Sequence, residues 1–273
     1  MGGWFYSGLL GGEIAVEVRE VHVSQLPRGL EGKKIAFLSD VHAGWMFPAK
    51  RVAQTVQALS ALEPDLLLIG GDLAETRQDE LEVIRALGTV PAPLGRYAVL
   101  GNNDSQRFMG AGQRQLRQAM ERSGISLLVN ERAEIAVEGG KLAVVGLDEM
   151  KYGRPRTEGL FAGMGEGNFC VLLSHYPQMA VVVAQSGSKP GPQLALCGHT
   201  HGGQFRLGRL TPYAVGYERK MRTGGPSLVH GWRRIGQTWI LVSNGLGTSS
   251  LPLRIGAQPQ IHKIILRTEK NHG

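Results

Sequence analysis

Short apolar runs alternate with amphipathic stretches along the first half of the chain. The segments KKIAFLSD (33–40) and DLLLIGGD (65–72) are apolar runs that end in polar residues, a pattern typical of buried strands. Between them, apolar residues recur with a helical period from Pro48 to Ala61, and proline favours the first turn of a helix. The same order returns further on, with helices expected around 80–87 and 113–122 and strands at 96–104 and 125–130.

The second half of the chain is richer in strands. Two alternating runs meet at Gly139-Gly140, which predicts a β-hairpin over residues 133–149. The repeated order of strand and helix predicts an α/β fold, in which two packed β-sheets with parallel elements are flanked by helices. The remaining expected elements are strands at 13–23, 168–177, 194–201, 238–245 and 260–267, and a helix at 178–185.

Length and composition favour one globular domain over residues 1–273. The 42% hydrophobic and 19% charged shares are ordinary for a globular protein, and no Pro/Gly/Ser-rich linker divides the chain. Cys170 and Cys197 both lie in apolar runs, which predicts two buried free thiols and excludes a disulfide framework. Free thiols fit a reducing compartment, so we expect a cytoplasmic protein.

The first ten residues, MGGWFYSGLL, are apolar and aromatic. They are too short to span a bilayer, which needs about 20 such residues, and they lack the basic region of a signal peptide. Three interpretations stay open for residues 1–10: the stub of a trimmed anchor, a segment that lies at the membrane interface, or a frayed terminus.

Polar residues of the kinds that bind metals follow five apolar strands, at the carboxyl end of each one. In open α/β sheets these ends face the binding crevice, so the side chains are expected to meet in space. A single histidine or aspartate after a strand is more often structural, but five such ends in one chain are hard to explain as coincidence. The residues are Asp40, His42, Asp72, Asn102, Asn103, Asp104, His175, His199 and His201.

The residue types predict a site for two divalent cations. In Asp40-Val41-His42 and His199-Thr200-His201, side chains two residues apart point to the same side of an extended backbone. Carboxylate, imidazole and amide ligands without a thiolate suit Mn, Fe, Zn, Co or Mg. More candidate ligands are present than one tetrahedral zinc ion uses, which implies two metal ions.

These segments resemble the signature of the calcineurin-like metallophosphoesterases, which runs D-x-H, G-D, G-N-H-D, H and G-H-x-H. The resemblance covers most of the chain and implies a four-layer sandwich of two mixed β-sheets flanked by helices. It implies a binuclear hydrolase that cleaves a phosphodiester or pyrophosphate bond, with manganese as the favoured metal. It also implies that Asp72 bridges the metals, that Asp40, His42 and His201 bind one, and that Asn102, His175 and His199 bind the other.

Two longer segments are similar to a bacterial branch of that family whose members are often membrane-associated. The segments are GHTHGGQ and GLGTSSLPLRIGAQPQI. This branch includes enzymes that cleave the pyrophosphate of UDP-2,3-diacylglucosamine in lipid A synthesis, so the likeness implies a phosphorylated, lipid-linked substrate and peripheral contact with the inner membrane. A nuclease or a cyclic-nucleotide phosphodiesterase is the alternative enzyme.

One position departs from the family signature. Where G-N-H-D has histidine, this chain has Asn103, and an amide donates a hydrogen bond but cannot deliver a proton. Asn103 and Asp104 are the candidate catalytic residues; for Asp104 the alternative is a turn cap, since the histidine that it orients in the family is missing. Three hypotheses follow from Asn103: a slower enzyme, a substrate whose leaving group is already acidic, or a metal-binding scaffold with impaired catalysis.

Positive charge gathers in residues 204–238. The chain carries a formal net charge of +7, and this segment holds seven lysines and arginines against the single acid Glu218. Because it follows the last candidate ligands directly, we expect it to form a basic rim that binds substrate phosphates or an anionic membrane. The alternatives are a solvated loop or, less favoured, a grip on single-stranded nucleic acid. The candidate substrate-binding residues are Arg206, Arg209, Arg219 and Arg222.

Overall fold

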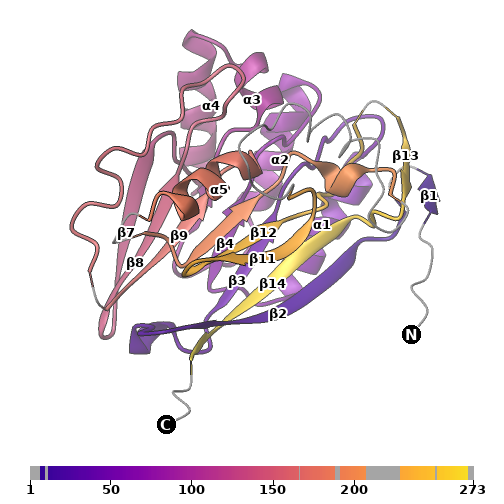
Figure 1. The fold of residues 1–273 in the computed structure, drawn as a ribbon. Helices are drawn as coiled ribbons and strands as arrows, with labels where there is room; N and C mark the ends of the chain where they lie inside the picture. Colours follow the sequence, from indigo (N-terminus) through magenta and orange to yellow (C-terminus); the bar gives the residue numbers. More distant parts are fainter. Residues whose placement is uncertain are drawn as a thin grey trace, which may run out of the picture.

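The computed structural model confirms the α/β architecture, with two six-stranded mixed sheets packed face to face (Figure 1). A further small sheet joins β1 (Ser7–Leu9) to β13 (Leu253–Ile255) in antiparallel register. The structure describes residues 7–9, 12–165, 167–187, 191–206, 228–249 and 251–269.

The first large sheet has the strand order β2-β14-β3-β4-β5-β6. Its central strands β3, β4, β5 and β6 run parallel, while β14 lies antiparallel to β3 and parallel to β2. The carboxyl ends of β3, β4 and β5 therefore share one edge. The bounds are β2 Ala15–Val23, β3 Lys34–Leu38, β4 Leu66–Ile69, β5 Arg96–Ala98, β6 Ser126–Leu127 and β14 Gln260–Thr268.

The second large sheet has the order β11-β12-β10-β9-β8-β7. Strands β8, β9, β10 and β12 are parallel, and the antiparallel strands β7 and β11 close the two edges. The predicted hairpin at Gly139-Gly140 is confirmed, since β7 and β8 pair across it. The bounds are β7 Glu131–Val137, β8 Gly140–Gly146, β9 Asn168–Leu173, β10 Leu194–Cys197, β11 Gly231–Ile235 and β12 Thr238–Val242.

Alternating side chains of the buried strands separate three apolar layers. In β3, Ile35 and Phe37 face the space between the sheets, while Ala36 and Leu38 face the helices on the outer side. Strand β9 repeats this alternation, and its Cys170 lies with Cys197 on the outer face of the second sheet. Because both faces of these strands are covered, their sequences are continuously apolar. Both cysteines are free and buried, as predicted.

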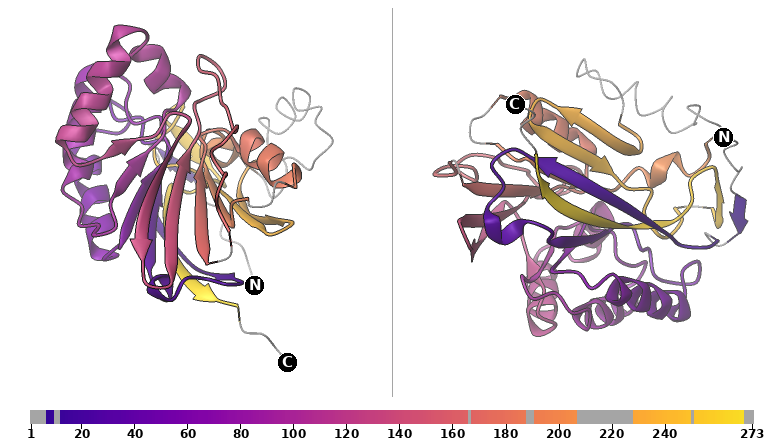
Figure 2. Two further views of the ribbon diagram at one scale, coloured as in Figure 1. Left: turned by 90° about the vertical axis from the view of Figure 1, so that its left-hand side faces the viewer. Right: turned by 90° about the horizontal axis from the view of Figure 1, so that it is seen from below.

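Helices cover the outer faces of both sheets, which completes a four-layer sandwich. In the left view of Figure 2, α1, α2 and α4 lie on one side of the sheets and α5 lies on the other. Helix α1 begins directly after Pro48, and the side chain of Thr76 caps α2 by accepting from the Asp79 N–H. The bounds are α1 Ala49–Ala61, α2 Arg77–Gly88, α4 Ala111–Arg122 and α5 Pro177–Gln185.

The structure adds short elements that the apolar pattern did not predict. Helix α3 (Asn102–Arg107) begins where we expected the end of a strand, and η1 (Arg28–Leu30) and η2 (His201–Gly203) are short 3-10 helices. Strand β11 occupies part of the basic segment 204–238. Within the N-terminal segment 1–10, residues 7–9 form β1, and the remaining positions lie outside the described residues. No helix in the described part of the chain has the length and apolar character needed to cross a bilayer.

Candidate metal centre

The candidate ligands meet where the carboxyl ends of the two sheets face each other. Asp40 and His42 follow β3, Asp72 follows β4, and Asn102 opens α3 after β5. His175 follows β9 of the second sheet, and the pair after β10 completes the set with His199 and His201. Backbone hydrogen bonds join the first two strand ends, from Asp40 N–H to Gly71 O (2.9 Å) and from His42 N–H to Asp72 O (3.1 Å).

The backbone is strained at five of these residues. Nine non-glycine residues in the described ranges have positive φ, and five of them are the candidate ligands Asp40, His42, Asp72, His199 and His201. Each such conformation costs on the order of 1–3 kcal/mol and persists only where the surroundings enforce it. Strain that gathers on one cluster of titratable side chains marks that cluster as a functional site.

Two glycines allow the strand ends to approach this closely. A Cβ atom at Gly101 would overlap the Asp72 carboxylate, and one at Gly198 would overlap the carboxylate of Asp40. Any side chain at either position would displace a candidate ligand. Glycine at these two positions therefore permits the close approach of the strand ends.

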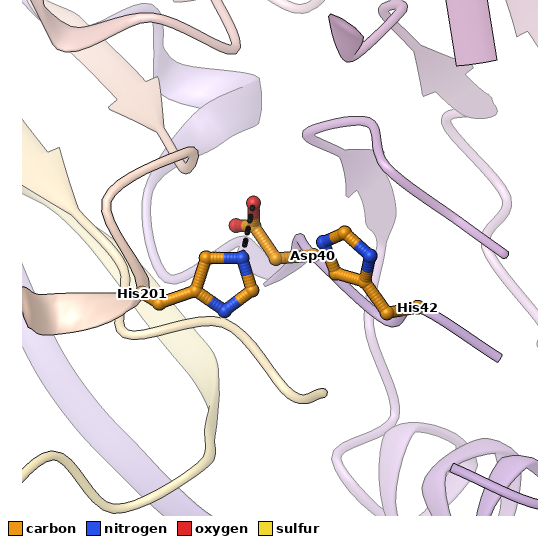
Figure 3. Close-up of side chains that lie close together, drawn as sticks. All are labelled: Asp40, His42 and His201. Carbon is orange, nitrogen blue, oxygen red and sulfur yellow. Dashed lines mark ion pairs between the residues drawn. The ribbon is translucent and has the colours of Figure 1, made fainter. Parts of the chain in front are cut away.

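The first group of candidate ligands consists of Asp40, His42 and His201. Their potential ligand atoms lie within 4.8 Å of one another, and all three residues are buried. Figure 3 shows the two imidazole rings beside the Asp40 carboxylate, and His201 Nε2 lies 3.7 Å from Asp40 Oδ1. The ring centroids of His42 and His201 are 4.9 Å apart.

The second group contains Asp40, Asp72 and His175, again buried and within 4.8 Å. His175 Nε2 lies 3.5 Å from Asp72 Oδ2 and 3.3 Å from His199 Nδ1, so His199 adjoins this group. Asp40 thus belongs to both groups, and His42 Nε2 lies 3.6 Å from Asp72 Oδ2. Two carboxylates therefore lie between two sets of imidazoles.

An aromatic side chain, Tyr176, links Asn102 to the candidate ligands of the second sheet. The Tyr176 hydroxyl donates to Asn102 Oδ1 at 3.3 Å, and the Tyr176 ring packs on the His199 ring with centroids 3.9 Å apart. The same ring meets His175 edge-on. Tyr176 consequently contacts the three residues that the family resemblance assigns to the second metal.

Hydrogen bonds orient two imidazoles so that Nε2 is available to a cation. His42 Nδ1 lies 2.6 Å from Glu75 Oε1, and His175 Nδ1 lies 2.7 Å from Gly70 O. Oxygen acceptors require that both Nδ1 atoms carry the proton, which is the usual arrangement of metal-binding histidines. His42 Nε2 is buried with no hydrogen-bond partner among the described residues. This orphaned nitrogen, beside Asp72, fits a bound cation.

Glu75 should therefore control metal affinity without touching the metal. We expect Glu75→Gln to weaken metal binding by about 10–100-fold, because partners that orient a ligating imidazole have effects of that size. Isothermal titration with Mn²⁺ measures the change. The matched variant Glu82→Gln, on an exposed position of α2, should bind like the wild type. Equal affinity in the two variants would show that Glu75 does not orient His42.

The charges of the cluster determine its protonation. Burial opposes the charged form of His175, but the Asp72 and Asp40 carboxylates raise its pKa to about 10. Burial and the positive charge of His175 lower the pKa of His199 to about 3. Protonated His175 therefore donates from Nε2 to neutral His199. A proton thus occupies the position where a cation would meet the imidazole.

Metal binding should release this proton. At pH 7 the metal-free protein holds His175 protonated, so we expect loading to release about one proton from it. Titration calorimetry in two buffers of different ionisation enthalpy measures the release, and a heat that is independent of buffer would contradict it.

The same proton makes the stability of the metal-free protein depend on pH. The pKa of His175 in the folded protein lies above its value of about 6.5 in the unfolded chain, so the stabilisation from this proton is fully present below pH 6.5. The stabilisation is lost as the pH rises to about 10.

The two candidate catalytic residues differ in their surroundings. Asn103 is partly exposed and donates two hydrogen bonds to the Asp72 carboxylate. Its backbone N–H lies 2.8 Å from Asp72 Oδ1, and its side-chain amide nitrogen lies 2.7 Å from Asp72 Oδ2. Asp104 is fully buried, and its carboxylate accepts from the backbone N–H groups of Gly101, Asp72 and Leu73. This geometry favours the interpretation of Asp104 as a turn cap. The same carboxylate also fixes the backbone after β4, where Asp72 lies.

Only one predicted substrate-binding arginine lies in the described part of the chain. Arg206 is partly buried, and its guanidinium donates to Gly202 O at 3.3 Å. Arg209, Arg219 and Arg222 lie outside the described residues.

A pocket of about 390 Å³ opens over the candidate ligands. His42, Asp72 and His199 form part of its floor, and Phe205 and Leu251 give it an apolar wall. The Leu251 side chain is 55% exposed, so the apolar wall reaches solvent. The pocket is large enough for a phosphorylated group with an organic substituent.

Sequence reasoning missed three residues that hold the ligands in place. These are Glu75 beside His42, Tyr176 beside His199, and Arg254, which contacts His201. Tyr176 follows His175 directly, so its position next to a ligand was the available signal. Glu75 and Arg254 carried no local signal, because they lie 33 and 53 residues from the histidines that they contact.

Comparison with known proteins identifies similar chains. The family model described as calcineurin-like phosphoesterase matches residues 33–203, which include all seven candidate ligands. The uncharacterized metallophosphoesterase YkuE of Bacillus subtilis strain 168 is 30% identical over 249 residues, covering 90% of this chain and 82% of YkuE. The phosphodiesterase YaeI of Escherichia coli K12 is 28% identical over 235 residues, covering 84% of this chain and 80% of YaeI.

A solved structure supports the fold assignment. The NAD nucleotidase of Haemophilus influenzae matches with a TM-score of 0.51 at 14% identity, covering 78% of this chain and 45% of that protein. At this identity the likeness concerns the fold alone. It agrees with the two-sheet sandwich described above.

Proposed function

We propose that this chain, which belongs to the calcineurin-like phosphoesterase family, hydrolyses a phosphodiester or pyrophosphate bond with two divalent cations. Its membership and its buried Asp and His groups make it a metal-dependent phosphoesterase. The observation that carries the proposal is the position of Asp40 and Asp72 between the two sets of imidazoles. Two buried carboxylates need positive charge nearby. Bound metal ions supply that charge and use the unprotonated imidazole nitrogens as ligands.

The side chains have distinct tasks in this proposal. Asp72 would lie between the two cations, Asp40, His42 and His201 would hold one, and Asn102, His175 and His199 would hold the other. When bound, such a pair polarises the phosphoryl group and activates water for in-line attack. The chain's own contribution is to fix the ligands. Glu75 and Gly70 O orient two imidazoles, and Asp104 fixes the backbone of Asp72.

The surroundings of Asn103 support a substrate with an acidic leaving group. Its amide nitrogen donates to Asp72, and an amide has no proton to give to a leaving oxygen. A pyrophosphate bond or an aryl ester needs little assistance of that kind, whereas an alkyl ester needs much. We therefore propose Asn103 as a residue that donates hydrogen bonds and does not act as a general acid.

Introducing histidine at this position tests that role. Asn103→His should raise kcat/KM for an alkyl phosphodiester by about 10²-fold, the lower range of general acid catalysis. The same variant should leave the hydrolysis of a pyrophosphate substrate nearly unchanged. Steady-state kinetics on the two substrates gives the comparison. An alkyl ester that is already the better substrate of the wild type, with no gain in the variant, would refute the leaving-group explanation.

The apolar wall supports the finer proposal of a lipid-linked substrate such as UDP-2,3-diacylglucosamine. Phe205 and Leu251 adjoin the ligands in the same pocket, so an acyl chain and a phosphoryl group can occupy it together. Trp45 is 72% exposed in the loop after His42, and such aromatic side chains suit membrane interfaces. We propose a cytoplasmic protein that contacts an anionic inner membrane peripherally, with manganese as the first metal to test.

One set of assays distinguishes the proposed hydrolase from two rival functions, a metal-binding scaffold and a nuclease or nucleotide phosphodiesterase. Metal analysis is combined with hydrolysis of bis(p-nitrophenyl) phosphate, a sugar nucleotide, a cyclic nucleotide and a lipid phosphate. Bound metal without turnover would favour a metal-binding scaffold. Preference for the cyclic nucleotide or for DNA, with a steep loss of activity in salt, would favour a nuclease or nucleotide phosphodiesterase. The similar protein YaeI is named a phosphodiesterase, which supports a hydrolase over a metal-binding scaffold.

A further inference from the structure

The loop that follows β8 carries three basic side chains. We name residues 148–156, with the sequence DEMKYGRPR, the basic loop. Its cations are Lys151, Arg154 and Arg156, and none of the three forms an ion pair within the part of the chain that the structure describes. Cations grouped on one loop repel each other unless an anion joins them.

The two acids of the basic loop are used to fix its backbone. Glu149 is 1% exposed, and its carboxylate accepts from the N–H groups of Lys151 (2.7 Å), Tyr152 (2.5 Å) and Gly153 (2.7 Å). Asp148 accepts from the N–H of Glu149 at 2.9 Å and from that of Arg154 at 2.8 Å. Neither acid forms an ion pair with any of the three cations among the residues that the structure describes.

A side chain from the turn before β7 ties the basic loop to the second sheet. Asn130 Oδ1 accepts from the N–H groups of Asp148 (3.1 Å) and Arg156 (2.9 Å), and its amide nitrogen donates to Arg154 O at 2.9 Å. The loop is thus held at both ends by hydrogen bonds to its backbone. Its basic side chains are free of this framework, so their removal leaves the framework intact.

A cavity of about 350 Å³ separates the basic loop from α3 and α4. Arg154, Arg156 and Tyr152 line one side, and Ser105 of α3 lines the other. The Ser105 hydroxyl is buried and has no hydrogen-bond partner in the described ranges. Two arginines therefore line the cavity, and guanidinium groups are donors that recognise a phosphate.

This cavity adjoins the metal centre across the first turn of α3. Asn102 and Asn103 line the pocket over the candidate ligands, while Asp104 and Ser105 line the cavity. The first turn of α3 therefore separates the cavity from the metal centre.

We propose that the basic loop is a subsite for a second phosphate group of the substrate, one that is bound and not cleaved. This inference rests on the proposed function and narrows its substrate class to compounds that carry a phosphate besides the one at which hydrolysis occurs. Arg154 and Arg156 bind the second phosphate through paired N–H donors, as guanidinium groups do with phosphates. Asp104 and Asp148 also line the cavity, but their oxygens are occupied by backbone N–H groups.

An anionic membrane is the other partner that a basic loop with exposed Met150 and Tyr152 suggests. The geometry favours the substrate, because Arg154 and Arg156 line a concave cavity and a bilayer surface cannot enter it. Free phosphate and a phosphate carried by the substrate share one chemistry. The test therefore distinguishes all three.

Two matched esters test the subsite. The 5′-p-nitrophenyl ester of thymidine 5′-phosphate and its 3′-phosphorylated counterpart differ by one phosphate. In the manganese-loaded wild type we expect kcat/KM to be at least about tenfold higher for the 3′-phosphorylated ester. Arg154→Gln/Arg156→Gln should abolish this preference. The control Arg114→Gln/Arg122→Gln removes the same charge from exposed positions of α4 and should keep it.

Each outcome decides the proposal. Turnover of bis(p-nitrophenyl) phosphate shows that the centre is active. With that activity present, the subsite is overturned if the wild type shows no preference or if the Arg154/Arg156 variant retains it. It is also overturned if free phosphate reproduces the gain on the simpler ester, or if the variant loses only its binding to phosphatidylglycerol vesicles.

Failure of the proposed function is separable from failure of the subsite. If no ester is hydrolysed, the hydrolase proposal fails, and the subsite is judged by calorimetry with thymidine 3′,5′-bisphosphate. Binding to the metal-loaded protein that weakens about tenfold in the Arg154→Gln/Arg156→Gln variant supports the subsite. Equal Kd values in the wild type and the variant overturn it.

Discussion

Replacing Asp72 by asparagine is expected to lower kcat/KM for bis(p-nitrophenyl) phosphate by about 10³-fold. Metal ions supply several kcal/mol of transition-state stabilisation, and each 1.36 kcal/mol corresponds to about tenfold in rate. Asp72 lies beside His42 and His175, 3.6 and 3.5 Å from their Nε2 atoms, so its charge serves both metal positions. An amide oxygen keeps the shape but not the charge.

The structure also explains why this substitution should preserve the fold. Asn103 donates two hydrogen bonds to the Asp72 carboxylate, and the asparagine oxygen can still accept one of them. The backbone N–H of residue 72 remains bonded to Asp104. Far-UV circular dichroism and thermal unfolding check the fold, and Asp79→Asn in the first turn of α2 is the matched control with unchanged activity. Full activity of Asp72→Asn would exclude a bridging role.

The second large effect is expected on stability. Arg254→Met should lower the free energy of unfolding by at least about 3 kcal/mol, because buried acceptors left unsatisfied cost about 1–3 kcal/mol each. Arg254 is 0% exposed and donates to the carbonyl oxygens of Gly247, His201 and Ala257. Its Nη2 also lies 3.2 Å from His201 Nδ1. Urea unfolding of the metal-free protein measures the loss.

An exposed arginine provides the comparison for Arg254. Arg267 pairs with Glu20 and Glu31 at the surface, so Arg267→Met should leave the unfolding midpoint nearly unchanged. Because Arg254 holds the His201 backbone, its variant should also bind manganese more weakly. Equal stability of the two variants would show that the buried guanidinium is not a structural brace for the metal centre.

The elements that sequence analysis predicted best are those whose signal is local. The runs that became β3, β4, β9 and β10 are continuously apolar because helices or the opposite sheet cover both faces. Their polar ends supplied the candidate ligands, since a residue's distance from the end of its own strand is visible in the sequence. The family match over residues 33–203 agrees with that interpretation.

Other features depend on contacts between distant segments, and the sequence alone does not reveal them. Helix α3 has the sequence NNDSQR, which has no apolar period, and it forms because Asp104 caps its own N-terminus and the Asp72 strand end. Which face of a fully apolar strand meets the other sheet is likewise undetermined by its pattern. The positive φ angles at Asp40 and His199 arise from such long-range packing.

The pattern of apolar residues also did not predict where short strands end. We expected a strand over residues 96–104, but β5 ends at Ala98. The chain then turns so that Gly101 can approach Asp72, and hydrogen bonds to Asp104 replace those of the sheet. Local tertiary contacts at the site thus shorten the strand.

The central claim is that this cluster holds two cations at once. Metal analysis of protein loaded with manganese and freed of excess ion, together with anomalous diffraction from its crystals, tests it most directly. We expect two ions per chain, both adjoining Asp72, and a loss of at least one in Asp72→Asn. A single ion, or two ions of which neither contacts Asp72, would contradict it.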